Sequence, residues 1–309
     1  MNLKQAQYMT TIAQCGSITA AAKKLFVSQP YLSQMLKQIE EDSGVTLFDR
    51  SVSPFRVTYA GELYLAAAEK IIAVNLQLEN QLNEVKHENK GRIRLGISVS
   101  RAMQVMPLVL PRFTSRYPDV TLELTESGSV KLDELLRSGN IDIALAAIES
   151  TNTDFAYELI EKETIGLLAG STSYLARNFP SGTPVSLQDA SHDKFVSLTQ
   201  GHSARVIQDH LFQKCNFMPR QMLETNSLEV GRRVALGSGA CMLLPNIYVD
   251  NYVRQMHGAF FPLQDYDNNR HFYACYRKGC YLPQYTRDFI QMTAQMLSTV
   301  RSCSLLDSD

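Results

Sequence analysis

The sequence predicts a multidomain protein with a helix-rich N-terminal module, one long helix and an α/β domain built of two lobes. A chain of 309 residues is too long for one ordinary domain and long enough to bury at least two cores. Residues 58–88 carry apolar side chains spaced alternately by three and four, as in one uninterrupted helix. From about residue 90 onward, short strand patterns alternate with helical ones, which indicates βαβ units.

The N-terminal module begins with two predicted helices. Residues 3–15 carry apolar side chains at helical spacing, and Gly16 ends this first helix. Ser17 can cap the helix that follows, because its hydroxyl can accept from an unpaired backbone N–H. The apolar face of this second helix consists of Ile18, Ala21, Ala22 and Leu25. Its alanines allow a partner helix to approach closely, so a packed helical pair is expected.

A longer third helix is predicted after Ser28, its N-cap, with Pro30 in a first turn where no helical hydrogen bond is lost. Its buried stripe is Leu32, Met35, Leu36 and Ile39. The opposite face carries Gln29, Pro30, Ser33, Gln34 and Lys37. Amides can hydrogen-bond base edges, a serine lets the backbone approach, and a lysine can neutralise a phosphate. This face predicts a DNA-binding helix, although a solvated helical hairpin has the same pattern.

The third helix is followed by a stop at Ser43-Gly44 and then by the pattern of a β-hairpin. Residues 45–55 predict two short strands that are joined around residues 51–54. Arg50 and Arg56 flank this wing and are placed for phosphate or minor-groove contacts. Exposed arginines that only solubilise the surface are the alternative.

The order of residues in this module resembles a known family. The pattern AAxxLxxSQPxxSxxLxxIE, followed by LFxR and Thr-Tyr-Ala-Gly, is similar to the N-terminal winged helix-turn-helix of the LysR-type transcriptional regulators. The matching positions are Ala21, Ala22, Leu25, Ser28, Gln29, Pro30, Ser33, Leu36, Ile39, Glu40, Leu47, Phe48, Arg50, Thr58 and Gly61. The resemblance implies that residues 1–58 bind double-stranded DNA. The expected DNA-binding residues are Gln29, Pro30, Ser33, Gln34, Lys37, Arg50 and Arg56.

The long helix needs a partner for its apolar stripe. About 28 residues at about 1.5 Å each give a helix of about 42 Å, which a 58-residue neighbour cannot cover alone. The stripe is Ala60, Tyr64, Ala67, Ile71, Val74, Leu78, Leu82 and Val85. Either a second copy of the helix or this chain's own C-terminal domain could cover it. The resemblance implies that residues 59–89 form a linker helix that pairs with its counterpart in a homodimer, and a homotetramer is also expected.

Residues 90–309 predict two α/β lobes. Strands are expected at residues 92–98, 120–125, 141–147, 164–168, 194–198, 221–224, 241–244 and 270–276. Helices are expected at residues 103–117, 130–138, 203–215, 227–237 and 284–300. Alternation of this kind favours a largely parallel sheet. Crossovers near 161–163 and 266–271 would divide the domain into lobe I, residues 90–162 and 268–309, and lobe II, residues 163–267.

Polar loops that end a strand and open a helix mark a candidate ligand site between these lobes. Such loops place helix N-termini, with their free N–H groups, at the carboxyl ends of the strands. The candidate residues are Ser98, Ser100, Arg101, Thr199, Gln200, His202 and Ser203, with Gly201 in the same loop. Helix capping by Ser100 and Ser203 is the alternative. The resemblance implies an effector-binding domain, similar to periplasmic binding proteins, that holds a small polar or anionic metabolite. Arg101 could favour an acidic effector or point to solvent.

Composition narrows the remaining possibilities. Apolar residues make up 45% of the chain and charged residues 20%, at a net charge of −1, which is typical of a globular protein. No apolar run is long enough to span a membrane and the N-terminus has no signal-peptide pattern, so a cytoplasmic protein is expected. Six scattered cysteines form no CxxC pair and lack histidines at zinc spacing, so no metal or cofactor is expected and the thiols are expected to be reduced.

An enzyme and a solute-binding protein are the rival functional classes. Two-lobed α/β domains host many chemistries. The sequence has no GxSxG, HExxH or Walker motif and its six histidines are dispersed, so no catalytic activity is expected. His202 could form a Cys–His pair with Cys215 or Cys241, and an ordinary loop histidine is the alternative. Turnover of a metabolite by the pure protein would revive the enzymatic hypothesis. A cytoplasmic solute-binding or enzymatic protein without a role in DNA binding is therefore the alternative to a transcriptional regulator.

Overall fold

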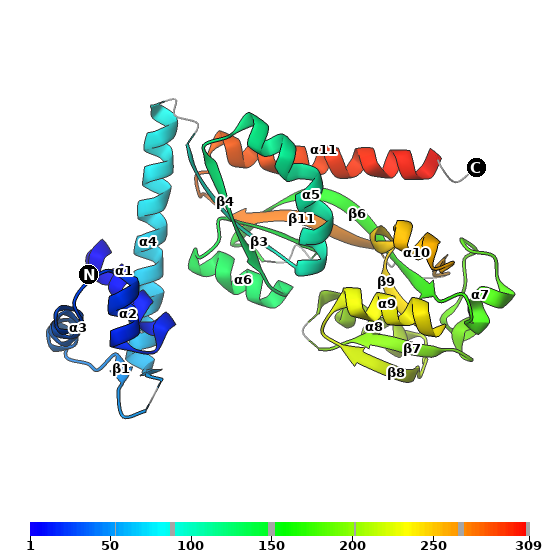
Figure 1. Cartoon of the computed structure of the whole chain (residues 1–309), viewed down its shortest axis with the longest axis horizontal. Helices are drawn as coiled ribbons and strands as arrows, with labels where there is room; N and C mark the ends of the chain where they lie inside the picture. Colours follow the sequence, from blue (N-terminus) through cyan, green and yellow to red (C-terminus); the bar gives the residue numbers. More distant parts are fainter. Residues whose placement is uncertain (53, 87–89, 148–151, 201, 265–268, 307–309) are drawn as a thin grey trace. The chain divides into compact units, whose positions relative to one another are not determined.

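The structure, a computed structural model, describes residues 1–309 except 53, 87–89, 148–151, 201, 265–268 and 307–309 (Figure 1). The chain divides into two compact units. The first comprises Met1–Arg92 and Leu135–Ile141, and the second comprises Ile93–Glu134 and Asp142–Asp309. Each unit is described in turn.

The first unit begins with short helices and a two-stranded wing, followed by a long helix. They are α1 (Leu3–Cys15), α2 (Ile18–Lys24), α3 (Gln29–Ser43), β1 (Phe48–Asp49), β2 (Arg56–Val57) and α4 (Tyr59–Val85). The core of α1 to α3 and the wing includes Met9, Ile12, Leu32, Leu36 and Phe48, all fully buried. These residues come from the predicted first and third helices and the hairpin, and Ala21 of the predicted second helix is buried with them, so the predicted helices and hairpin are confirmed.

Local capping explains where these helices begin and end. Ser17 and Ser28 accept hydrogen bonds from the backbone N–H groups of Ala20 and Tyr31, both at 3.4 Å, as predicted. Gly16 ends α1 with φ +59°, a conformation that favours glycine. A Cβ at Gly16 would also lie 2.7 Å from Cβ of Pro54 in the wing. Helix termini and wing are therefore fixed by the same few residues.

Helix α4 carries exposed apolar residues along its second half. Val74, Leu78 and Leu82 are each at least half exposed. Its first turn is anchored on the wing: the Thr58 hydroxyl accepts from Gly61 N–H at 3.0 Å, and a Cβ at Gly61 would lie 2.1 Å from the Leu47 carbonyl oxygen. The predicted end of the helix at residue 88 lies outside the described residues.

Lobe I of the second unit combines long helices with the first strands of a sheet. Its described elements are β3 (Gly91–Ile97), α5 (Val99–Arg116), β4 (Val120–Glu126), α6 (Ser129–Ser138), β5 (Ile143–Ala147), the first part of β6 (Phe155–Ala169), β11 (Asn269–Arg277) and α11 (Gln284–Leu306). Its core centres on Val105, Phe113, Leu145, Phe272 and Phe289. Helix α5 begins four residues before the predicted start, so Pro107 and Pro111 lie inside the helix, on its exposed side, rather than near its start.

Lobe II contains the remaining described elements of the second unit. They are α7 (Tyr174–Asn178), the 3₁₀ turn η1 (Leu187–Ala190), β7 (Lys194–Leu198), α8 (Ser203–Lys214), β8 (Arg220–Thr225), α9 (Leu228–Ser238), β9 (Cys241–Pro245), the 3₁₀ turn η2 (Asn246–Tyr248), α10 (Asn251–Gln255) and β10 (Ala259–Pro262). The short elements α7, α10 and β10 were not predicted.

The strands of both lobes form one continuous mixed sheet, in the order β4-β3-β5-β11-β6-β9-β7-β8, with β10 paired to β6. The pairs β3–β5, β7–β8 and β7–β9 are parallel, while β11–β5, β11–β6, β6–β9 and β10–β6 are antiparallel. The prediction of a largely parallel sheet is therefore wrong for the two crossover strands. Strand β6 runs from lobe I into lobe II, and β6 and β11 are antiparallel to each other and to the further strands with which they pair.

Candidate functional site

The polar face of α3 has the composition of a DNA-recognition surface. Gln29, Pro30, Gln34 and Lys37 are exposed and Ser33 is half-buried, whereas the predicted apolar stripe is buried apart from Met35, which is half-buried. The N-terminal turn therefore presents amide and hydroxyl groups together at one end of a firmly packed helix. Side chains of this kind can hydrogen-bond base edges in the major groove.

The cations near α3 differ in how far their charge is already compensated. Arg50 forms an ion pair with Glu40, whose carboxylate also accepts from the N–H groups of Leu47 at 2.8 Å and Phe48 at 3.3 Å. Arg50 thus joins the wing to α3, a structural role that the sequence reasoning missed. Lys37 lies 3.4 Å from Glu41 in an exposed pair, which holds it only weakly. Arg56 is exposed on β2.

A pocket of about 460 Å³ lies in the second unit and is lined by residues of both lobes. Of the predicted ligand-binding residues, Ser98, Ser100, Arg101 and His202 line it, and Thr199 and Gln200 do not. The side chain of Ser203 and residue Gly201 lie outside the described residues. Further polar lining residues, which the sequence reasoning missed, are Ser127, Ser129, Asn226, Ser227, Glu229, Tyr248 and Arg270.

Among the described elements, four helices begin at this pocket, two from each lobe. Ser98 precedes α5 and Ser129 opens α6, while His202 precedes α8 and Ser227 precedes α9. The Ser227 hydroxyl accepts from Val230 N–H at 3.3 Å, but the side chains of Ser98 and His202 make no capping hydrogen bond. The positive ends of these helix dipoles, with polar side chains beside them, favour a negatively charged or hydrogen-bond-accepting ligand.

Arg101 occupies a buried charge cluster at one wall of the pocket. It is only 4% exposed, so the expectation that it points to solvent is wrong. Its guanidinium pairs with Glu161 at 3.5 Å and with Glu163, both on β6, and lies 3.9 Å from the ring centroid of Phe272. Arg270 on β11 lies 4.0 Å from Glu163, and burial lowers the pKa of its guanidinium. The cluster ties α5 to both crossover strands and balances two arginines with two carboxylates.

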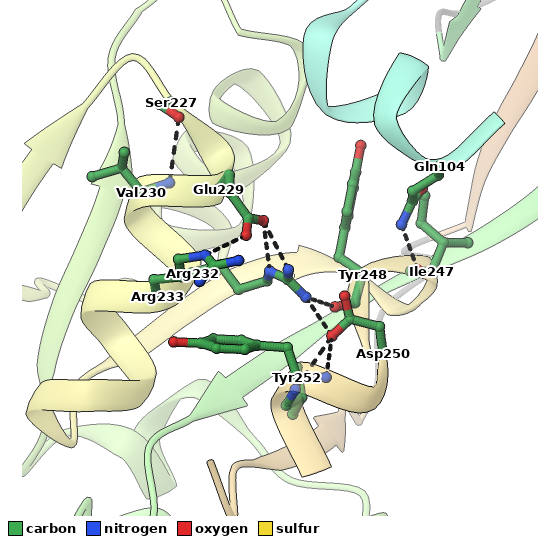
Figure 2. A network of polar contacts seen from close by, with 11 residues as sticks. Gln104, Ser227, Glu229, Val230, Arg232, Arg233, Ile247, Tyr248, Asp250 and Tyr252 are labelled. Atoms are coloured by element: carbon green, nitrogen blue, oxygen red, sulfur yellow. Dashed lines mark hydrogen bonds and ion pairs between the residues drawn. The ribbon is translucent and has the colours of Figure 1, made fainter. Parts of the chain in front are cut away.

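Figure 2 shows a second polar network, in lobe II, which includes Glu229 and Tyr248 of the pocket lining. The Glu229 carboxylate pairs with Arg232 at 2.8 Å and Arg233 at 2.5 Å. Arg232 in turn donates to the Tyr248 carbonyl at 2.8 Å and pairs with Asp250 at 2.7 Å. The charge of Glu229 is therefore neutralised inside the protein rather than presented to the pocket.

The same view shows a direct link between the lobes. The side-chain amide of Gln104 on α5 donates to the Ile247 carbonyl of η2 at 2.9 Å (Figure 2). Residue 248 follows directly in η2 and lines the pocket. The first two turns of α5 and the turn η2 thus join the pocket wall of one lobe to that of the other.

The described residues contain no cluster of metal ligands, and two of the cysteines are buried thiols. No group of three or more His, Cys, Asp or Glu residues there could hold a metal ion. Burial raises the pKa of the Cys275 thiol to about 12 and also raises that of the Cys241 thiol, which disfavours the thiolate in both. In the described part of the chain no helix is long and apolar enough to cross a lipid bilayer.

A helix-turn-helix with a wing, followed by a two-lobed α/β domain with a pocket between its lobes, defines a ligand-responsive DNA-binding regulator. Two family models match the chain: "Bacterial regulatory helix-turn-helix protein, lysR family" over residues 3–62 and "LysR substrate binding domain" over residues 86–298. The chain belongs to the LysR family of transcriptional regulators, with a DNA-binding and an effector-binding domain.

Individual relatives agree with this assignment. The HTH-type transcriptional regulator BsdA of Bacillus subtilis is 30% identical over 266 residues, which cover 83% of this chain and 89% of BsdA. The regulator CfxR of Cupriavidus necator is 28% identical over 79% of this chain and 75% of CfxR.

Solved structures show the same fold. A full-length OxyR variant of Pseudomonas aeruginosa superposes with a TM-score of 0.72 at 22% identity, over 96% of this chain and 98% of that one. Full-length CbnR in complex with its target DNA superposes with a TM-score of 0.66 at 20% identity, over 96% of this chain and 100% of the CbnR chain.

Proposed function

We propose that this regulator binds operator DNA through the exposed polar face of α3. The single observation that carries the proposal is that face: Gln29, Pro30, Gln34 and Lys37 are exposed on a helix whose other side is buried. Gln29, Ser33 and Gln34 would contact base edges, while Lys37 and Arg56 would contact adjacent phosphates. Arg50 would hold the wing at the angle that brings it to the DNA backbone.

The protein acts as a homodimer, and as a homotetramer where two dimers bind neighbouring sites. The support for this is the exposed apolar side of α4, where Val74, Leu78 and Leu82 would be covered by the same helix of a second copy. Residues 1–58 carry six basic and four acidic side chains, an excess of only two positive charges. Two modules would double the number of phosphate contacts and bind the two halves of an inverted repeat.

The effector is a small polar or anionic metabolite that binds in the pocket between the lobes. Ser98, Ser100, Ser129 and His202 would supply hydrogen bonds, and the helix N-termini that begin there would supply a positive potential. A ligand with different affinities for two arrangements of the lobes shifts the population between them. This shift would alter the spacing of the two DNA-binding modules and the bend of the operator.

The protein is a cytoplasmic regulator rather than an enzyme. Family membership supports the absence of catalysis. The raised pKa of the buried thiols of Cys241 and Cys275 agrees with it, since neither forms a nucleophilic thiolate at neutral pH. Turnover of a pocket ligand by the purified protein would contradict this part of the proposal.

Selection of duplexes from a random library, followed by gel-shift titration, tests DNA binding. Ser33→Arg and Gln29→Ala are expected to weaken retention of the selected duplex and to leave ligand binding unchanged. Ser100→Trp, which fills part of the pocket, should do the reverse. If the wild-type protein selects no duplex from the library, a solute-binding protein without a role in DNA binding is indicated instead.

A thermal-shift screen of small carboxylates, amino acids and sulfur compounds tests the effector site. A compound that binds only the folded state raises the melting temperature of the wild type. The same compound should fail to raise the melting temperature of Ser100→Trp. An equal shift in both proteins would place the ligand outside this pocket.

A further inference from the structure

Lys4, in the first turn of α1, is held between two tyrosine rings. Its Nζ lies 5.5 Å from the ring centroid of Tyr8 and 5.4 Å from that of Tyr31. The two rings meet edge to face with centroids 6.3 Å apart. Tyr8 is buried in the core of the module, so one wall of this cluster is fixed. The ammonium group is therefore positioned by its neighbours, unlike that of an ordinary exposed lysine.

The position of Tyr31 places this ammonium beside the DNA-recognition face. Tyr31 is the third residue of α3 and follows directly after Gln29 and Pro30. In helix-turn-helix proteins the first residues of the recognition helix enter the major groove, and phosphates line the edges of that groove. If α3 enters the groove in this way, a cation on the flank of its first turn would lie next to the DNA backbone.

The charge of Lys4 is also not shared with a carboxylate. Lys37 pairs with Glu41 and Arg50 pairs with Glu40, whereas no Asp or Glu of the described residues forms an ion pair with Lys4. Its neighbours are aromatic, and hydrogen bonding with Tyr31, followed by the charge interactions with both phenols, raises the pKa of the Lys4 ammonium. Lys4 thus stays fully charged at neutral pH and its charge remains available to an anion.

We propose that Lys4, positioned by Tyr8 and Tyr31, binds a phosphodiester group of the operator at the edge of the groove that α3 enters. The proposal rests on the function proposed above for α3 and adds a contact outside α3 and the wing. Because the aromatic rings restrict the lysine before DNA arrives, the contact forms with little further loss of side-chain freedom. The contact is to the backbone, so it strengthens binding to every sequence alike.

The salt dependence of DNA binding tests this contact. The probes are a duplex selected by the wild-type protein and an unrelated duplex of equal length. Each phosphate contact contributes about 0.9 to the slope of log Kobs against log salt concentration, so Lys4→Gln should reduce the slope by about 2 in a dimer. Affinity at about 0.15 M salt should fall by roughly tenfold or more, in the same ratio for both duplexes. Lys4→Arg should retain the wild-type slope.

Lys86→Gln is the matched control, because Lys86 is an exposed lysine beyond the last residue of α4. It removes the same charge and is expected to leave the slope unchanged. A Lys4→Gln slope equal to that of the wild type and of Lys86→Gln would overturn the proposal. That result would leave the proposed function intact, whereas a wild type that selects no duplex would contradict the proposed function itself.

Tyr31→Leu tests whether the aromatic cluster positions the lysine. Alone, this substitution should weaken DNA binding and change the salt slope little, since the lysine can still reach the phosphate. In the Lys4→Gln background it should have no further effect beyond about twofold, because the two residues act through one contact. If the affinity loss of the double variant equals the product of the losses in the two single variants, the positioning role of Tyr31 is overturned.

Discussion

The carboxylate of Glu40 provides the sharpest test of how the winged module is held together. It accepts from the backbone N–H groups of Leu47 and Phe48 and pairs with Arg50, and its side chain is only 14% exposed. Glu40→Ala leaves two backbone donors of buried residues without this acceptor. At about 1–3 kcal/mol for each unsatisfied donor, the local free energy of opening should fall by about 3 kcal/mol. Both N–H groups donate to the same oxygen, Oε1, so the amide oxygen of Glu40→Gln can keep both bonds, and this variant should lose mainly the ion pair with Arg50.

Hydrogen exchange of the wing, measured by mass spectrometry on peptides that span residues 44–57, reports this opening. A loss of about 3 kcal/mol accelerates exchange there roughly a hundredfold. Glu41→Ala is a close control, because the exposed side chain of the adjacent Glu41 forms an ion pair with the exposed Lys37. Its removal should change the free energy of opening by less than about 0.5 kcal/mol. Equal exchange in Glu40→Ala and Glu41→Ala would refute the reasoning.

Three further predictions follow from buried or strained side chains. Phe26 is 96% exposed and adopts φ +55°, so Phe26→Asn should stabilise the module by about 1 kcal/mol in urea denaturation. Glu163→Ala removes one of the two carboxylates that pair with Arg101, so the free energy of unfolding should fall by about 3–5 kcal/mol. Glu163→Gln should cause a smaller loss. Equal stability of both variants and the wild type would contradict the ion pairing. Burial and a hydrogen bond to Glu158 raise the pKa of Tyr276 to about 12, above its value of about 10 in the unfolded chain. Its contribution to stability should therefore be complete below pH 10 and lost as the pH rises to 12, a dependence that Tyr276→Phe should remove.

Local signals in the sequence were sufficient for the winged module. Capping serines, glycines at positive φ and apolar stripes act within a few residues of one another, so they can be recognised without the tertiary structure. The ion pair of Glu40 with Arg50 was missed although both residues belong to the family pattern. A charge that contacts another element looks the same in the sequence as a solvated one.

The effector domain was predicted less completely. Only residues 164–168 of β6 were expected as a strand, because Glu158, Glu161 and Glu163 interrupt the apolar pattern. Two of those glutamates are buried against Arg101, a pairing between β6 and α5 that no local pattern announces. Ser127 and Asn226, in contrast, carry a signal that is present in the sequence. They follow β4 and β8 by the same rule that identified Ser98 after β3.

The continuity of β6 limits how the two lobes can move. Its first part pairs with β11 in lobe I and its last residues pair with β9 and β10 in lobe II. Sliding of one lobe along the other would break these ladders, so closure over a ligand has to be a bend or twist of the two crossing strands. Insertion or deletion of a single residue near Glu161 would turn the following side chains to the opposite face of the sheet. The length of this strand is therefore fixed by the two lobes that it joins, because one residue more or less would expose side chains that are now buried in lobe II.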